Sequence, residues 1–171
     1  MEGYIQVYTG NGKGKTTASL GLALRAAGAG LKVFVGQFIK AGDYSEIKAL
    51  ARFSDLVTVK QYGKGRFIKG KPAPEDVTAA ARGLKELQEI VSGGQWDVVI
   101  LEEGNVAVTV GLLTEEDLLD LMDRKPSHVE LVITGRGALP AVIDKADLVT
   151  EMKEIKHYFQ KGVVARVGIE K

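Results

Sequence analysis

The most informative segment of the chain is the glycine-rich Thr9-Gly10-Asn11-Gly12-Lys13-Gly14-Lys15-Thr16-Thr17. It follows the apolar run 5–8 and precedes an amphipathic helical pattern over Lys15–Ala27. Glycines at such a junction let backbone N–H groups approach phosphate oxygens, and the helix N-terminus adds a favourable dipole. The pattern G-x-x-x-x-G-K-[ST] has Thr9 in place of its first glycine, but Gly10 and Gly12 remain. The stretch predicts a P-loop that binds the triphosphate of ATP; the alternative is a glycine-rich turn before a helix.

Two side chains of this loop carry the chemistry. Lys15 is expected to supply a point charge to the terminal phosphates and to act as a catalytic residue. The Thr16 hydroxyl is placed to ligate Mg²⁺, which prefers oxygen ligands. Lys13 does not stand where a second lysine marks the dimeric, membrane-partitioning P-loop ATPases, so that subgroup is disfavoured. All residues from Thr9 to Thr17 are expected to bind ATP.

Apolar runs alternate with helical patterns along the rest of the chain. Strands are expected at Tyr4–Tyr8, Val33–Phe38, Leu56–Tyr62, Val98–Leu101, Glu130–Thr134, Leu148–Glu151 and Val163–Val167. Helices are expected at Lys15–Ala27, Ser45–Phe53, Pro74–Val91, Thr114–Met122 and Pro140–Ala146. Pro74 suits a first helical turn, and Thr114 with Asp117 resembles a capping box. The alternation predicts an α/β fold of the P-loop type, with a mostly parallel central sheet and helices on both faces. The length predicts one domain over residues 1–171.

An acidic pair, Glu102-Glu103, follows directly on the buried run Val98–Leu101. In P-loop proteins an acid at this place faces the phosphate loop and holds magnesium. Both glutamates are therefore expected at a metal site with Thr16. Asn105 leaves the strand at its carboxyl end, where open α/β sheets bind ligands. The alternative is an ordinary charged pair that ends a strand.

A second loop at the same sheet edge is Thr134-Gly135-Arg136-Gly137, which follows the buried run 131–133. An arginine there can form paired hydrogen bonds with phosphate oxygens, so Arg136 is expected to stabilise a departing triphosphate. The alternative is a surface arginine in a glycine turn. His128 and His157 show no metal-ligand spacing.

The composition and charge of the chain limit the classes of binding partner that are expected. The formal net charge of +1 argues against a broad electrostatic interaction with nucleic acid or a membrane surface. The absence of cysteine excludes disulfides and thiolate metal sites. With no signal-like segment and no apolar stretch long enough to span a bilayer, a cytoplasmic protein is expected.

Taken together, these residues resemble the corrinoid adenosyltransferases, which make the cobalt–carbon bond of adenosylcobalamin from ATP. The resemblance covers nearly the whole chain and rests on the P-loop with Ala18–Gly28, Gln37–Lys40, Val99–Asn105, Thr134–Gly137, Ala146–Met152, Lys156-His157 and Gly162-Val163. It implies a recombinase-like P-loop fold, ATP and Mg²⁺, a corrinoid substrate, a flavoprotein reductant and a homodimer.

The resemblance also implies the chemistry. ATP would lie reversed in the loop relative to kinases, because the C5′–O bond breaks and the whole triphosphate leaves. Reduced Co(I) is the nucleophile, so the protein needs no general base and its task is positioning and charge stabilisation. Phe67, Asn105, Gly135 and Arg136 are expected on the corrinoid side.

Three features depart from the family pattern. Members generally have Asp-Glu where this chain has Glu102-Glu103, and a larger apolar residue in place of Gly104. Many have Phe-Thr-Trp after the Gly-x-Gly that corresponds to 63–65, with aromatic residues that displace the lower cobalt ligand; here Phe67 is the aromatic residue available. Some members carry an N-terminal arm that closes the corrin site, and this sequence shows none. Two other hypotheses therefore stay open, a P-loop kinase and a non-catalytic ATP-binding regulator.

Overall fold

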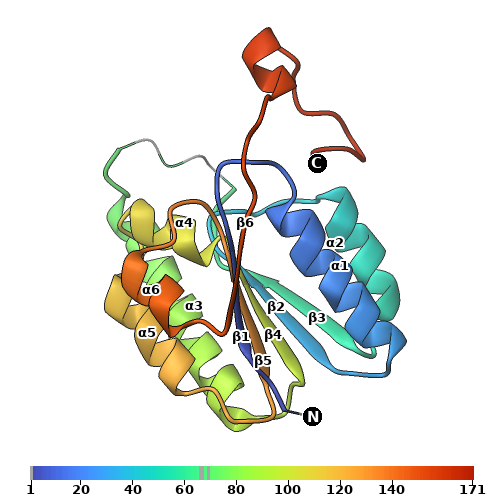
Figure 1. Ribbon diagram of the computed structural model, residues 1–171, viewed down its shortest axis with the longest axis vertical. Coiled ribbons are helices and arrows are strands. Elements are labelled where there is room, and N and C mark those ends of the chain that lie inside the picture. Colours follow the sequence, from blue (N-terminus) through green and yellow to red (C-terminus); the bar gives the residue numbers. More distant parts are fainter. Residues whose placement is uncertain (1, 66–67, 69) are drawn as a thin grey trace.

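The computed structural model describes residues 2–65, 68 and 70–171. Within these residues six strands form one sheet in the order β3-β2-β4-β5-β1-β6 (Figure 1). The strands are β1 (Ile5–Thr9), β2 (Val33–Gln37), β3 (Val57–Gln61), β4 (Val98–Glu102), β5 (Glu130–Thr134) and β6 (Leu148–Glu151). Every pairing among them is parallel, so their carboxyl ends meet at one edge. The predicted α/β fold with a parallel sheet is confirmed.

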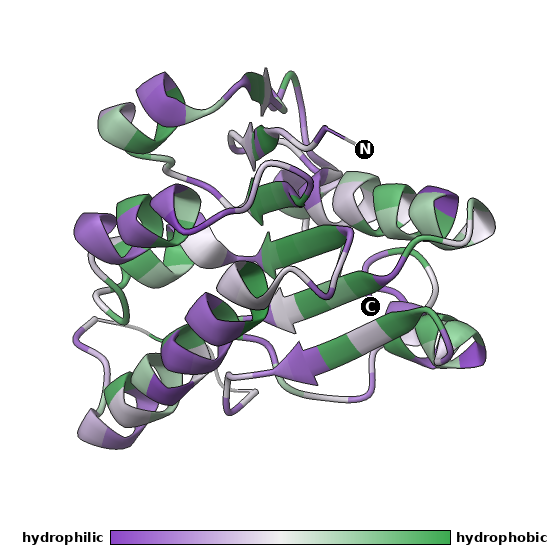
Figure 2. Ribbon diagram, turned by 90° about the horizontal axis from the view of Figure 1, so that it is seen from below, coloured by the Kyte–Doolittle hydropathy of each residue, from purple (hydrophilic) through white to green (hydrophobic). Residues whose placement is uncertain are grey.

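Helices cover both faces of the sheet, as predicted (Figure 1). On one face lie α1 (Lys15–Gly28) and α2 (Ser45–Leu50), the latter extended by a 3₁₀ turn at Ala51–Phe53. On the other lie α3 (Pro74–Gly93), α4 (Gly104–Thr109), α5 (Glu115–Asp123) and α6 (Pro140–Lys145). The central strands β2, β4 and β5 are largely hydrophobic (Figure 2), because both of their faces are buried, whereas the edge strand β6 is exposed.

Each face has its own hydrophobic core. Leu20, Ala23, Ala26 and Ala27 of α1 pack with Val35, Ile100 and Val132 of the sheet. On the opposite face, Leu84 and Leu87 of α3 and Leu118 and Leu121 of α5 pack with Phe34, Leu131 and Ile133. Two independently packed faces hold the carboxyl edge of the sheet, and the loops that follow it, in a fixed position.

Local signals set the helix boundaries as the sequence predicts. The Thr114 hydroxyl accepts a hydrogen bond from the Asp117 N–H at 3.2 Å, and the Asp117 carboxylate accepts one from the Thr114 N–H at 2.8 Å. This reciprocal pair is the expected capping box at the start of α5. Pro74 lies in the first turn of α3, and Gly94 ends that helix with φ of 58°.

Two local predictions differ from the structure. The strand expected at Val163–Val167 is wrong: these residues, all of which the structure describes, form no strand. A 3₁₀ turn at Tyr158–Lys161 precedes them, and Val164 and Val167 are exposed. β-branched residues favour a strand only where neighbouring strands and side chains receive them. In addition, α4 follows the acidic pair, where no helix was expected.

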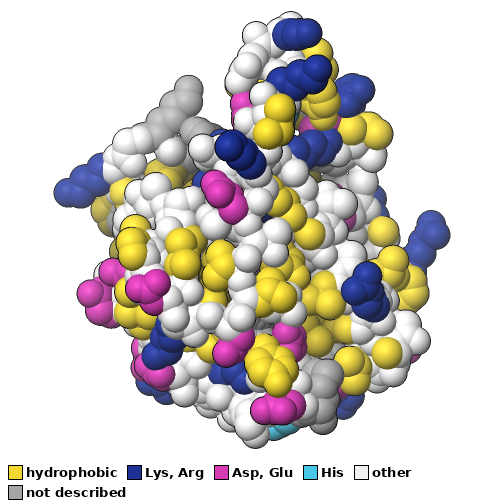
Figure 3. Space-filling model, viewed as in Figure 1, with side chains coloured by type: hydrophobic (Ala, Val, Ile, Leu, Met, Phe, Trp, Pro, Cys, Tyr) yellow, Lys and Arg dark blue, Asp and Glu magenta, His cyan; other side chains and the backbone are white. Residues whose placement is uncertain are grey.

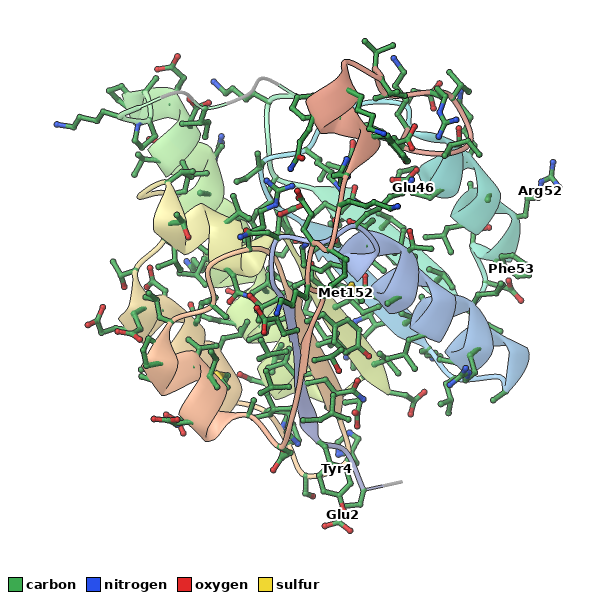
Figure 4. The ribbon with its side chains drawn as sticks, turned by 45° about the horizontal axis from the view of Figure 1, so that its top comes forward. Glu2, Tyr4, Glu46, Arg52, Phe53 and Met152 are labelled. Carbon is green, nitrogen blue, oxygen red and sulfur yellow. The ribbon has the colours of Figure 1, made fainter. Side chains whose placement is uncertain are left out.

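After β6 the chain leaves the sheet and crosses the P-loop. The Gly12 N–H donates to the carbonyl of Met152 at 2.6 Å, and the Met152 N–H donates to the carbonyl of Thr9 at 2.9 Å. Figure 4 labels Met152 beside the start of α1. A Cβ atom on Gly10 or Gly12 would lie 2.5 or 2.6 Å from the Met152 carbonyl oxygen. These two glycines are therefore also required by the close approach of two backbone segments.

In the part of the chain that the structure describes, no helix is long and apolar enough to cross a membrane.

Candidate functional site

A cavity of about 1010 Å³ lies at the carboxyl edge of the sheet. From the P-loop it is lined by Gly12, Lys13, Gly14, Lys15, Thr16 and Thr17. Glu103 and Arg136 line it from the loops after β4 and β5. Tyr44, Ser45 and Glu46 close one side at the start of α2 (Figure 4), and residues 168–171 close another. The fold thus brings three separately predicted groups, the P-loop, the acidic pair and the arginine loop, to one cavity.

Lys15 lies at the floor of this cavity and is 9% exposed. Its ammonium group donates to the carbonyls of Gly10 and Gly12, each at 2.7 Å. Burial lowers the pKa of Lys15 below its ordinary value, and the nearby Arg136 guanidinium lowers it further. An anion bound in the loop would offset both effects, because it restores the interactions that a buried ammonium loses on leaving water.

Thr16 and Glu102 are in direct contact across the sheet edge. The Thr16 hydroxyl donates to Oε1 of Glu102 at 2.8 Å, and the Thr134 hydroxyl donates to the same oxygen at 2.8 Å. Glu102 is fully buried at the end of β4, although β5 separates β4 from the P-loop strand β1. The two hydroxyls therefore fix the carboxylate toward the start of α1. Thr134 is a site residue that sequence reasoning had quoted only as part of a motif.

Lys40, just beyond β2, is the residue that sequence reasoning missed as a member of the site. Its ammonium lies 3.2 Å from Oε2 of Glu102, 3.2 Å from the Thr16 hydroxyl oxygen and 3.7 Å from Oε1 of Glu103. Burial lowers the pKa of Lys40, but the carboxylates of Glu102 and Glu103 outweigh it and hold that pKa above its ordinary value. The available signal was positional: β2 pairs with β4, so a cation after one strand lies beside acids after the other.

Glu103 differs from its neighbour in exposure and backbone. Its side chain is 22% exposed and lines the cavity, whereas that of Glu102 is 0% exposed. Burial, together with the adjacent Glu102 carboxylate, raises the pKa of Glu103 above its ordinary value. Glu103 has φ of 60° and its N–H donates to the Thr134 hydroxyl at 3.0 Å. The turn brings the Glu103 carboxylate within 3.7 Å of the Lys40 ammonium, which also contacts Glu102.

The oxygens gathered here fit a magnesium ion. A hydroxyl and two carboxylates are the hard oxygen ligands that Mg²⁺ binds, usually together with phosphate oxygens of a nucleotide. The Lys40 ammonium already shows that a cation is accepted between Thr16, Glu102 and Glu103. Among the described residues, no cluster of three or more histidine, cysteine, aspartate or glutamate side chains could hold a metal alone. The donor set therefore suits a metal that arrives with phosphate.

The arginine loop places its residues in different environments. Arg136 is exposed, lines the cavity and has no hydrogen-bonded or ion-paired partner among the described residues. Gly135 is buried with φ of 127°, and a Cβ atom there would lie 2.9 Å from the Val106 nitrogen. Asn105 is 1% exposed and its side-chain amide donates to the Gly135 carbonyl at 3.2 Å. Asn105 and Gly135 thus join α4 to the arginine loop and are not among the residues that line the cavity, and their predicted contact with a corrinoid stays a prediction.

Three residues of the predicted ATP-binding stretch do not line the cavity either. The Thr9 hydroxyl accepts a hydrogen bond from the Ala138 N–H at 3.2 Å, and Thr9 ends β1 as an ordinary strand residue. This explains why the loop tolerates threonine there. Gly10 has φ of 92° and lies under Met152, and Asn11 is exposed.

The segment expected on the corrinoid side starts at the cavity. Gly65 lines it, and a Cβ atom on Gly63 or Gly65 would lie 2.3 or 2.5 Å from backbone atoms of Ile39 or Ala41. Both glycines therefore pack against the turn that carries Lys40. Phe67 lies outside the described residues, so its predicted role stays a prediction.

The C-terminal residues form the rim of the cavity above Lys13. The Lys13 ammonium contacts the Glu170 carboxylate at 2.8 Å, the Ile169 carbonyl at 3.0 Å and the Tyr158 hydroxyl at 3.1 Å. Arg166 and Tyr158 also hydrogen-bond Glu170. Figure 3 shows basic and hydrophobic side chains together on this projecting segment. Lys13 therefore links the P-loop to the C-terminus.

Gly104 is explained by its neighbour Leu101. A Cβ atom on Gly104 would lie 2.7 Å from Cδ2 of Leu101 and 3.2 Å from Cγ2 of Ile133. We expect Gly104→Val to lower the free energy of unfolding by about 1–3 kcal/mol, the usual effect of overpacking a core. Chemical denaturation measures this change. The double variant Leu101→Ala/Gly104→Val should lose less than the sum of its parts; simple additivity, or an unchanged Gly104→Val midpoint, would contradict the explanation.

Comparison with known sequences gives a consistent result. The model of the family described as ATP:corrinoid adenosyltransferase BtuR/CobO/CobP matches residues 1–170. The corrinoid adenosyltransferase of Pseudomonas aeruginosa is 36% identical over 169 residues, which cover 98% of this chain and 83% of the relative. The corrinoid adenosyltransferase of Escherichia coli K12 is also 36% identical over 169 residues, covering 98% and 85%.

Among solved structures, a KaiC-like protein of Pyrococcus horikoshii superposes with a TM-score of 0.60. It is 16% identical, and the match covers 91% of this chain and 75% of that one. At this identity the likeness concerns the fold alone, which is the recombinase-like P-loop fold that the sequence predicted.

Proposed function

This chain belongs to the ATP:corrinoid adenosyltransferase family, and we propose that it transfers the 5′-deoxyadenosyl group of ATP to the Co(I) of a reduced corrinoid. The reaction serves the synthesis or salvage of adenosylcobalamin. The observation that carries the proposal is a single cavity lined by Lys15, Thr16, Glu103 and Arg136. The buried Glu102 carboxylate lies behind it, hydrogen-bonded to Thr16. Family membership then selects this chemistry among those that a P-loop supports.

In the proposed reaction the cobalt of the corrinoid substrate attacks C5′ of ATP. A Co–C bond forms, the C5′–O bond breaks, and its electron pair leaves with the triphosphate. Lys15 and Arg136 stabilise that negative charge from two sides of the cavity. Among the described residues that line the cavity, none needs to remove a proton, because the nucleophile is a metal centre without one.

Charge neutralisation and space both support this arrangement. Bound Mg²⁺ would neutralise part of the triphosphate charge, and Thr16, Glu102 and Glu103 are the residues that would hold it. The cavity of about 1010 Å³ is at the upper end of small-molecule sites, so it has room beyond the triphosphate. We propose that ATP lies reversed in the loop, with C5′ toward the open side.

Further proposals follow from the family. They are a homodimer, a flavoprotein that reduces the corrinoid, a cytoplasmic location and one domain over the whole chain. We also propose that Phe67, two residues after the cavity-lining Gly65 in the sequence, displaces the lower cobalt ligand.

The products decide among the hypotheses. ATP and Mg²⁺ are incubated with chemically reduced cobalamin, while the absorption spectrum and the released phosphate species are followed. The proposed reaction gives an alkylcobalt spectrum and triphosphate. A P-loop kinase releases ADP, and a regulator binds ATP without turnover; either result would overturn the proposal.

A further inference from the structure

Lys40 occupies the position where the three predicted magnesium ligands converge. Its ammonium is 3.2 Å from both the Thr16 hydroxyl oxygen and Glu102, and 3.7 Å from Glu103. No ammonium could stay there while a metal ion used the same three groups, because two cations would share one set of oxygens. The contacts of Lys40 and a metal bound by the same three groups therefore exclude each other, so binding of a metal must displace the ammonium.

The backbone is strained directly before this lysine, at Ile39. The Lys40 N–H donates to the Phe38 carbonyl at 2.6 Å across Ile39, whose φ is 65°. A hydrogen bond from residue i+2 to residue i across a positive φ is the pattern of the rare, strained γ-turn. Positive φ is an outlier for a β-branched residue, and such strain is concentrated at functional sites.

The second residue with positive φ, Glu103, lies 3.7 Å from the same ammonium. Among the described residues, Ile39 and Glu103 are the non-glycine residues with positive φ. One directly precedes Lys40 and the other supplies a carboxylate to it. Thus two separate turns with positive φ, one after β2 and one after β4, supply the members of one ion pair, that of Lys40 with Glu103.

The charges explain what the lysine does there. Glu102 is fully buried and Glu103 is adjacent to it, so without a counter-ion the two carboxylates repel each other. The lysine side chain is 24% exposed and lines the cavity, so its ammonium has a short path toward a bound triphosphate. A single flexible side chain can therefore serve the acids in one state and the phosphates in the other.

We propose that Lys40 is a positioning residue that acts as the counter-ion of Glu102 and Glu103 and holds them and Thr16 in place before nucleotide binds. When Mg·ATP binds, magnesium displaces the Lys40 ammonium, which turns toward the triphosphate. Consequently the protein excludes bare divalent cations and accepts the metal together with its nucleotide. This inference rests on the magnesium site of the proposed function.

The test measures binding of Mn²⁺, a spectroscopic substitute for Mg²⁺, from the loss of its free electron paramagnetic resonance signal. Lys40→Met and Lys40→Gln remove the charge, and Lys40→Arg retains it. Lys48→Met is the matched surface control, since Lys48 on α2 pairs with the exposed Asp43 outside the cavity. Each protein is titrated with Mn²⁺ alone and with Mn²⁺ plus ATP.

Without nucleotide, we expect Lys40→Met and Lys40→Gln to bind Mn²⁺ at least about tenfold more tightly than wild type, because a unit charge a few ångströms away no longer opposes the metal. Lys40→Arg and Lys48→Met should match wild type. The melting temperature of Lys40→Met should rise with added Mn²⁺, whereas that of wild type should not.

Unchanged nucleotide-free Mn²⁺ affinity in folded Lys40→Met or Lys40→Gln would overturn the inference. Wild-type protein that binds Mn²⁺ equally well with and without ATP would also overturn it, which keeps the test decisive if a variant fails to fold. The ATP arm separates the two proposals: if wild type binds no Mn²⁺ without ATP, and with ATP none beyond what free ATP chelates in solution, the magnesium site itself fails.

Discussion

Lys15→Ala is expected to weaken Mg·ATP binding by about ten- to a hundredfold, since a buried charge-assisted contact contributes roughly 1.5–3 kcal/mol. The Lys15 side chain is the buried cation of the loop, and its ammonium also donates hydrogen bonds to the Gly10 and Gly12 carbonyls. Its removal deletes a phosphate contact and loosens the loop that supplies backbone N–H groups. Isothermal titration with ATP and with inorganic triphosphate measures the effect, and both ligands should lose affinity alike.

Lys48→Ala is the matched control, because it removes a lysine from the neighbouring helix α2 without touching the cavity. It should bind ATP as wild type does. An affinity of Lys15→Ala within twofold of wild type would show that the loop is not the triphosphate site. Loss with ATP alone and not with inorganic triphosphate would place Lys15 near the nucleoside instead.

Glu102→Gln is expected to weaken the apparent affinity for Mg²⁺, measured through ATP binding, by about 10–100-fold. This is the usual range for residues that hold or orient a metal. Glutamine preserves the shape of the side chain, but it removes the charge that Thr16, Thr134 and Lys40 surround. The measurement is the ATP dissociation constant over a series of Mg²⁺ concentrations. At saturating Mg²⁺ the variant should approach wild type.

Glu103→Gln provides the comparison within the acidic pair. Among the residues that the structure describes, Glu103 makes no hydrogen bond to Thr16, and it lies farther from the Lys40 ammonium than Glu102 does, at 3.7 Å against 3.2 Å. We therefore expect a smaller shift than for Glu102→Gln. If Glu103→Gln abolished the Mg²⁺ dependence and Glu102→Gln left it intact, the assignment within the pair would be reversed.

The fold was predictable because its signals are local. Strand–helix alternation and the glycine-rich junction before Lys15 indicate a parallel sheet with a phosphate loop, and the capping box at Thr114 and Asp117 marks a helix start. By contrast, α4 carries glycine and three β-branched valine or threonine positions within Gly104–Thr109, which are poor helix formers. Packing against β5, rather than propensity, holds that helix.

The residues of the candidate site were predictable where a single sequence motif contains them. They were not predictable where the order of the strands in the sheet brings them together. Glu102 meets Thr16 across an intervening strand, and the acid strand was still foreseen because it follows a buried run. Lys40 joins this pair only because β2 lies beside β4, which no short sequence pattern states. The segment Val163–Val167 failed for the opposite reason: its residues favour a strand, but the chain has already left the sheet across the P-loop.

In the proposed reaction the C5′–O bond of ATP breaks and C5′ becomes bonded to cobalt. The direct test uses ATP labelled with ¹³C at C5′, chemically prepared cob(I)alamin, Mg²⁺ and the purified protein, followed by ¹³C and ³¹P nuclear magnetic resonance. In the proposed reaction the labelled carbon becomes bound to cobalt, while intact triphosphate accumulates in equal amount. Label that remains in ADP, AMP or adenosine, with no cobalt-bound carbon formed, would contradict it.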